Sequence, residues 1–118
     1  MNGAQALTYF GLELARASAQ LGLEHPPKVR PVTVAERDPR AAATVVAYVT
    51  PDRTEVHVLW WALWKYGKKT LRCVARHEAL HIALGHEAPG DPDRAERQHQ
   101  DVDEVLRIKW NEPKRCGL

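Results

Sequence analysis

The feature that most constrains this chain is a helical repeat of apolar residues over residues 69–84 that also carries two histidines. The apolar residues that share a helical face with these histidines are Val74, Leu80 and Leu84. His77 and His81 lie on this face, and Gly85 directly follows the segment in a position that ends many helices. Because a buried imidazole needs a polar partner, the helix must pack against a core and also satisfy its histidines.

The two histidines belong to an H-E-x-x-H motif. Four residues of an α-helix turn through about 400°, so His77 and His81 project together and are suitably placed to bind one tetrahedral Zn²⁺. Glu78 follows the first histidine, which predicts that it is the general base for a zinc-activated water. The alternative is an ordinary surface helix with three polar residues, but the apolar neighbours of the histidines argue against it. The motif therefore predicts one zinc ion per chain.

A catalytic zinc normally has three protein ligands, and the third is expected on a last helix over residues 93–109. His99 lies close to the apolar stripe of that helix, so we predict it as the third ligand. Asp101, Asp103 and His86 are the alternatives. Asp103 is also our prediction for a carboxylate that orients a ligand imidazole. His86 directly follows Gly85, where a histidine can simply complement the helix dipole.

The rest of the chain predicts a small sheet and one further helix, which makes an α+β domain over residues 1–118. Apolar residues at helical spacing predict an N-terminal helix, and segments rich in β-branched residues predict strands. Pro51 predicts a turn that joins the last two strands in a hairpin. Residues 109–118 are expected to form a loose tail. The additional helix and the strands are predicted at 4–21, 28–35, 43–50 and 54–60.

Composition excludes several classes of protein. A net charge of +2 gives little reason to expect a nucleic-acid partner. The chain has no apolar run of about 18 residues, as a membrane span needs, and residues 1–10 do not resemble a secretory leader, so we predict a cytoplasmic protein. Cys73 is expected to be a small buried apolar residue and Cys116 a free thiol.

A strand, a helix with H-E-x-x-H, a glycine and a further helix with a third ligand together resemble the zincin metallopeptidases. The segment from Thr54 to Leu106 is similar to the minimal members of that clan, such as the ImmA/IrrE-like and SprT-like peptidases and small phage and prokaryotic metallopeptidases. The resemblance implies a zincin-like fold and a zinc-dependent peptidase. It also implies that an extended polypeptide substrate lies antiparallel to an edge strand, here residues 54–60.

Two other functions fit parts of the same sequence. A catalytically inactive metal-binding or interaction module would use a closed zinc site, with His86 joining His99 as a ligand. A nucleic-acid-associated protein with an incidental motif would bind no metal and would bind DNA in a salt-sensitive way.

Overall fold

The computed structural model describes residues 1–42, 44–87 and 90–118. Its helices and strands follow the predicted order, with one additional short helix before the motif helix. The elements are α1 (Gly3–Gln20), β1 (Lys28–Val32), β2 (Ala47–Val49), β3 (Glu55–Leu59), α2 (Trp60–Lys65), α3 (Lys68–Ala83), α4 (Pro92–Trp110) and a 3-10 helix, η1 (Lys114–Gly117).

The three strands form one mixed sheet with β3 in the middle. β1 pairs with β3 in parallel, with Val29 opposite Val56, and β2 pairs with β3 antiparallel, with Tyr48 opposite His57. The predicted hairpin between the last two strands is therefore confirmed. The expectation that residues 54–60 form an edge strand is wrong, because β3 is hydrogen-bonded on both sides and has no free edge for a peptide.

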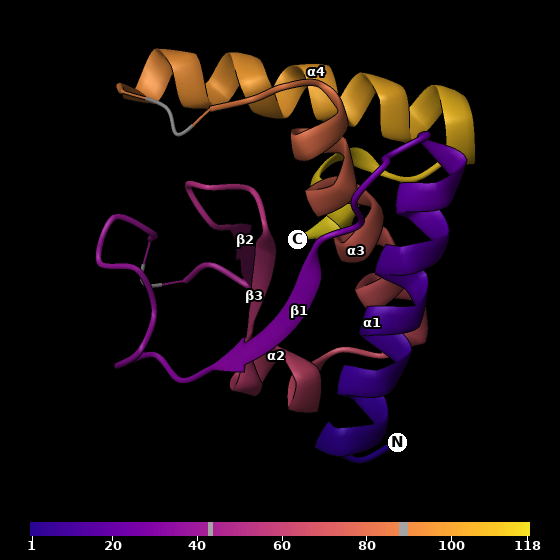
Figure 1. Cartoon of the computed structure of the whole chain (residues 1–118), viewed down its shortest axis with the longest axis vertical. Coiled ribbons are helices and arrows are strands. Elements are labelled where there is room, and N and C mark those ends of the chain that lie inside the picture. Colours follow the sequence, from indigo (N-terminus) through magenta and orange to yellow (C-terminus); the bar gives the residue numbers. More distant parts are fainter. Residues whose placement is uncertain (43, 88–89) are drawn as a thin grey trace.

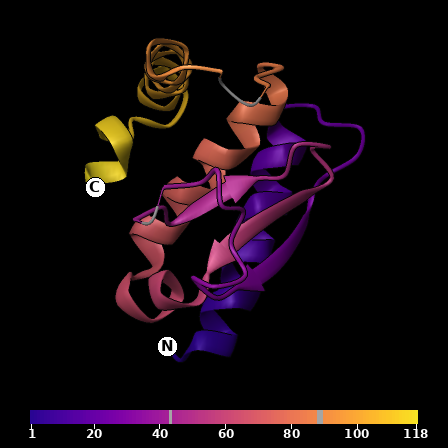
Figure 2. The ribbon, with the colours of Figure 1, turned by 90° about the vertical axis from the view of Figure 1, so that its left-hand side faces the viewer.

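The sheet and helices make two layers with an apolar core between them. α1 packs along α3 and lies behind the sheet in Figure 2, whereas residues 33–42 pass in front of it. α4 crosses the C-terminal end of α3, at the top of Figure 1. Within the described ranges, no helix has both the length and the apolar character needed to cross a bilayer. The fully buried core side chains include Phe10, Leu14, Val56, Val58, Leu71, Leu80, Val102 and Leu106.

Local capping explains where the long helices begin and end. The Asn2 side chain accepts a hydrogen bond from the Gln5 backbone N–H, and the Gln5 side chain accepts one from the Asn2 backbone N–H. This pair of bonds forms a capping box at the start of α1. Asp91 caps α4 by accepting from the backbone N–H of Arg94. Gly85 has a φ of +70°, so the left-handed position predicted after α3 is present.

The predicted helices agree with the structure to within a residue or two at each end, whereas the strands are shorter. The strand predicted over 28–35 ends at Val32, and the one predicted over 43–50 covers only Ala47–Val49, with residue 43 outside the described residues. Trp60, predicted as the end of a strand, instead begins α2.

The C-terminal residues are packed against the domain, which corrects the prediction of a loose tail. Cys116 forms a disulfide with Cys73 of α3, so the expectation of unpaired cysteines is also wrong. The Arg115 backbone N–H and Nε donate to Asp103 of α4 at 2.9 and 2.7 Å. Glu112 is buried, 3.7 Å from the Arg76 guanidinium. These contacts join the end of the chain to both helices that carry the predicted ligands.

Candidate metal centre

Three histidines from two helices converge at one point. His77 and His81 project from α3 and His99 from α4, and each offers a ring nitrogen within 4.8 Å of the other two. The Nε2 atoms of His77 and His81 are 3.0 Å apart, and the His99 ring centroid lies 5.5 Å from each of the other two. The structure therefore brings together the three residues that the sequence predicted as ligands.

The packing of α4 explains why His99 reaches the motif. Val102 and Leu106 are completely buried, so the face that carries them must lie against the core. His99 is three residues before Val102 and seven before Leu106, which places it on the same side of the helix. α4 crosses the C-terminal end of α3, where the motif lies (Figure 1). This side of α4 therefore brings the His99 ring against those of His77 and His81.

Burial keeps the histidine cluster uncharged. It lowers the pKa of His77 to about 4, assisted by the nearby His99. It lowers the pKa of His81 to about 2, with the neighbouring His77 acting in the same direction. The pKa of His99 is also lowered, by burial and by the positive charge of Arg115. Neutral imidazoles have a lone pair to offer, so near neutral pH all three can act as metal ligands.

Glu78 directly follows His77 on α3 and is buried. It is 5% exposed and makes no hydrogen bond to the described part of the chain. Burial raises the pKa of its carboxyl to about 8, because no nearby cation compensates for the lost hydration. A carboxyl in this state can hold a proton near neutral pH, which is a property that general acid–base groups require.

His86, the residue after Gly85, contacts the outer side of the cluster. Its Nδ1 lies 3.0 Å from the Nδ1 of His81, which is the ring nitrogen opposite the one that faces His77. His86 is therefore not one of the converging ligands, and the closed site with a fourth histidine is not formed. Sequence reasoning considered only a ligand or helix-dipole role for this residue and missed its contact with His81.

The two aspartates proposed as alternative ligands lie outside the cluster. Asp103 accepts two hydrogen bonds from Arg115 and none from a histidine of the described chain, so its predicted role in orienting an imidazole is not found. Its negative charge nevertheless acts to raise the pKa of His77 and of His99. The Asp101 side chain is 65% exposed and lies 3.6 Å from the Nε2 of His86.

The donor set matches what zinc uses in proteins. Imidazole nitrogen is a common zinc ligand, and three protein ligands leave one position open for water or substrate. Two neutral imidazoles with facing Nε2 atoms 3.0 Å apart can share one proton or bind one cation, and a third nitrogen beside them favours the cation. The cluster can therefore hold a metal ion.

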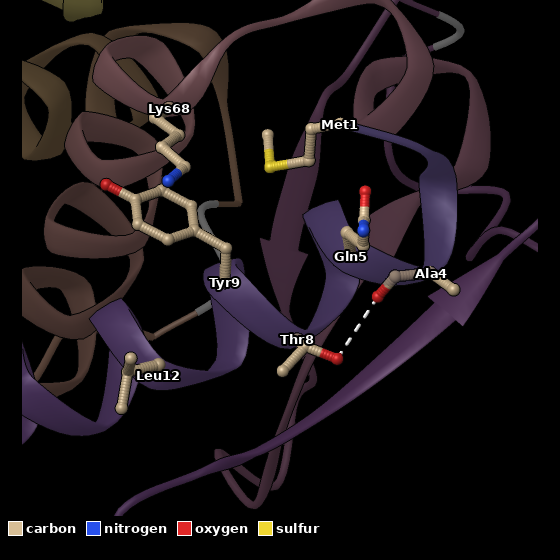
Figure 3. Close-up of a pocket in the computed structure, with 7 residues that line it drawn as sticks. All are labelled: Met1, Ala4, Gln5, Thr8, Tyr9, Leu12 and Lys68. Carbon is tan, nitrogen blue, oxygen red and sulfur yellow. Dashed lines mark hydrogen bonds between the residues drawn. The ribbon is translucent and has the colours of Figure 1, made fainter.

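We compare two hollows on the described part of the surface, and one of them adjoins His86. This cleft of about 450 Å³ is lined by His86, Asp101 and polar residues around the start of α4. The other, of about 570 Å³, is formed mainly by α1, where Tyr9 and Lys68 face each other (Figure 3). Lys68 begins α3, nine residues before His77, or about 13 Å along a helix. The α1 hollow therefore lies at the far end of α3 from the cluster.

Searches of protein-family models, curated proteins and solved structures find no match to this chain. The motif and the geometry of the histidine cluster are therefore the features of this chain that point to a function.

Proposed function

We propose that this protein is a zinc-dependent peptidase in which His77, His81 and His99 bind the metal and Glu78 is the general base. The observation that carries the proposal is the convergence of three neutral imidazoles, together with a buried glutamate that directly follows the first of them in sequence. This combination of groups suits the hydrolysis of a carbonyl compound. The resemblance of the motif region to the minimal zincins favours a peptide as the substrate.

Each residue has a distinct task in this proposal. The three histidines would hold the ion, and a bound zinc would polarise the substrate carbonyl and acidify a water molecule. Glu78 takes the proton of the attacking water and passes it to the leaving amine. Burial favours the protonated form of this carboxyl in the metal-free chain, and a bound zinc would favour the carboxylate form that a general base needs.

The edge of the sheet next to α3 supports an extended polypeptide as substrate. β2 has β3 on one side, and no other described strand pairs with its second side. The bonds from Leu59 N–H to the Val46 carbonyl and from Thr50 N–H to the Glu55 carbonyl set the alternation along β2. In an antiparallel pair the intervening residues direct their backbone groups away from the partner strand, so Ala47 and Val49 offer theirs to a peptide.

The proposal is tested with purified protein loaded with zinc and a quenched fluorescent peptide library. We expect the wild-type chain to bind one zinc and to cleave peptides. Glu78→Gln should retain the zinc, since Glu78 is not a ligand, and lose hydrolysis by about 10²–10⁴-fold. Metal content is measured by elemental analysis on the same samples.

Three outcomes would contradict parts of the proposal. Wild-type protein that cannot be loaded with zinc removes the metal assignment and the peptidase with it. Zinc binding without cleavage would favour the non-catalytic metal-binding module. Loss of zinc in Glu78→Gln would make Glu78 a ligand instead of a base.

A further inference from the structure

We propose that His86 and Asp101 form a positioning pair that fixes the proton and the orientation of the His81 ring. This inference depends on the metal-binding role proposed above for His81. It assigns a function to a residue outside the H-E-x-x-H motif.

The contacts of the His81 ring support this assignment. Its Nε2 faces the Nε2 of His77 at 3.0 Å, towards the centre of the cluster. Its Nδ1 faces the Nδ1 of His86 at 3.0 Å, with the two ring centroids 5.2 Å apart. One nitrogen of His81 is therefore directed to the proposed metal position, and the other contacts the His86 ring.

The positions of the protons follow from this arrangement. A neutral imidazole that binds a metal through Nε2 carries its hydrogen on Nδ1, so His81 must donate from Nδ1. His86 must then accept at its own Nδ1 and carry its hydrogen on Nε2. This Nε2 lies 3.6 Å from the Oδ2 of Asp101, which leaves a carboxylate beyond the second ring and slightly outside hydrogen-bond distance.

The turn after α3 holds His86 in place. The left-handed Gly85 reverses the chain, and the backbone N–H of His86 donates to the His81 carbonyl at 2.9 Å. The Arg53 guanidinium donates to the Gly85 carbonyl at 3.0 Å, which ties the turn to the loop that precedes β3. The His86 side chain is only 12% exposed, so its ring has little freedom to leave His81. Backbone hydrogen bonds as well as side-chain contacts therefore hold the His86 ring against His81.

An acceptor at this position should strengthen metal binding in two ways. It keeps the His81 ring in the orientation that presents Nε2, and it raises the basicity of the ligand nitrogen. Removing such a partner typically lowers metal affinity by about 10–100-fold. Asp101 is one step further away and mostly exposed, so its loss should have a smaller effect.

The experiment measures zinc affinity by competition with a chromophoric chelator. His86→Phe keeps a ring but loses the acceptor, and we expect it to bind zinc about 10–100-fold more weakly. His86→Asn restores an acceptor close to the same position and should recover most of the affinity. Asp101→Ala should lose only a few-fold. The matched control is His25→Phe, because His25 is an exposed histidine before β1 and should leave affinity unchanged.

A second measurement reports the proton directly. Nitrogen-15 NMR of the zinc-loaded wild-type protein should show His81 protonated at Nδ1 and His86 protonated at Nε2. His81 bound to zinc through Nδ1, or unchanged affinity in a folded His86→Phe protein, overturns the proposal. Weaker zinc binding in His86→Phe, with affinity restored in His86→Asn, supports the proposal whether or not the chain cleaves peptides. Wild-type protein that binds no zinc overturns both this inference and the proposed function.

Discussion

At the residue scale, the buried histidines set the pH range over which the site can hold a metal. Protons compete with a metal for the same nitrogen, and an ordinary imidazole begins to lose this competition below about pH 6.5. Burial lowers the pKa of His77 to about 4 and that of His81 to about 2. We therefore expect zinc to remain bound at pH 5, as measured by metal retention after dialysis across a pH series. Release with a midpoint above pH 6 would contradict the neutral cluster.

Glu78 should make the metal-free protein less stable as the pH rises, whereas zinc binding is favoured at higher pH. Its pKa rises from the ordinary value of 4.5 to about 8 in the folded state, so between these pH values the folded chain holds a proton that the unfolded chain has released. Stability should therefore fall as pH rises through this window and level off above it. Glu78→Gln removes the effect. Urea unfolding of both metal-free proteins is measured at pH 5, 7 and 9. As the pH rises, the free energy of unfolding of the wild type should fall relative to that of the variant.

Three side chains of α4, those of His99, Asp101 and Asp103, should contribute to different extents to zinc affinity. His99→Ala removes one of three converging nitrogens and should weaken zinc binding far more than Asp101→Ala. Asp103→Ala should have a modest effect, since Asp103 bonds to Arg115 and acts on the histidines only through its charge. Chelator competition measures all three. Equal losses in His99→Ala and Asp103→Ala would argue against His99 as the third ligand.

The relative placement of side chains on one helix was predictable, because helical geometry fixes the direction in which each side chain projects. His77, Glu78 and His81 follow from spacing alone, and His99 follows from the apolar stripe that must face the core. The role of His86 was not predictable, because it depends on the path of the chain through the turn at Gly85. Asp103 was misassigned because its partner, Arg115, lies in a segment with no periodic pattern.

At the element scale, β2 is the strand that we propose for substrate binding, because no described strand pairs with its outer edge. Val49→Pro removes a backbone N–H that points away from β3, so it should leave the sheet and zinc affinity intact while raising KM for peptides by about 2–10-fold, the value of one hydrogen bond. Peptide kinetics and zinc titration together measure this. The matched variant Tyr48→Pro removes an N–H that bonds to β3 and should destabilise the fold. An unchanged KM in Val49→Pro would exclude this edge as the substrate strand.

The position of a strand within the sheet could not be read from the sequence. Alternating residues indicate that 54–60 is a strand, but the pattern is the same for a middle strand and an edge strand. β3 becomes central because β1 pairs with it in parallel, although residues 33–54, which include β2, separate the two strands in sequence. Such non-local pairing leaves no signal in local spacing.

At the scale of the whole molecule, the C-terminal segment holds α3 and α4 together. Cys116 is bonded to Cys73, and Arg115 contacts both Asp103 and Glu96, which lie on either side of His99 in sequence. Reduction, or Cys116→Ala, should lower the free energy of unfolding by about 2–5 kcal/mol and weaken zinc binding. Denaturant unfolding and chelator competition with and without a reductant measure the two effects. The same unfolding midpoint under both conditions would contradict a stabilising disulfide.

The disulfide was not predictable, because its two cysteines are 43 residues apart and only the fold brings them together. Asn111, with a φ of 53°, ends α4 and redirects the chain towards α3. Disulfides persist mainly in oxidising compartments, so this bond does not favour the cytoplasmic location predicted from the sequence. The compartment stays a prediction.

The same bond has a consequence for the denatured chain. The ring it closes runs from Cys73 to Cys116 and contains His77, His81 and His99. When the oxidised protein unfolds, these imidazoles stay tethered to one another at a raised effective concentration. If zinc is the metal, as we propose, it would also bind the denatured ring, and this would reduce the stabilisation that it gives to the folded state. A metal that stays with the ring would also be present when the chain refolds, so the site could re-form without capturing zinc anew from solution.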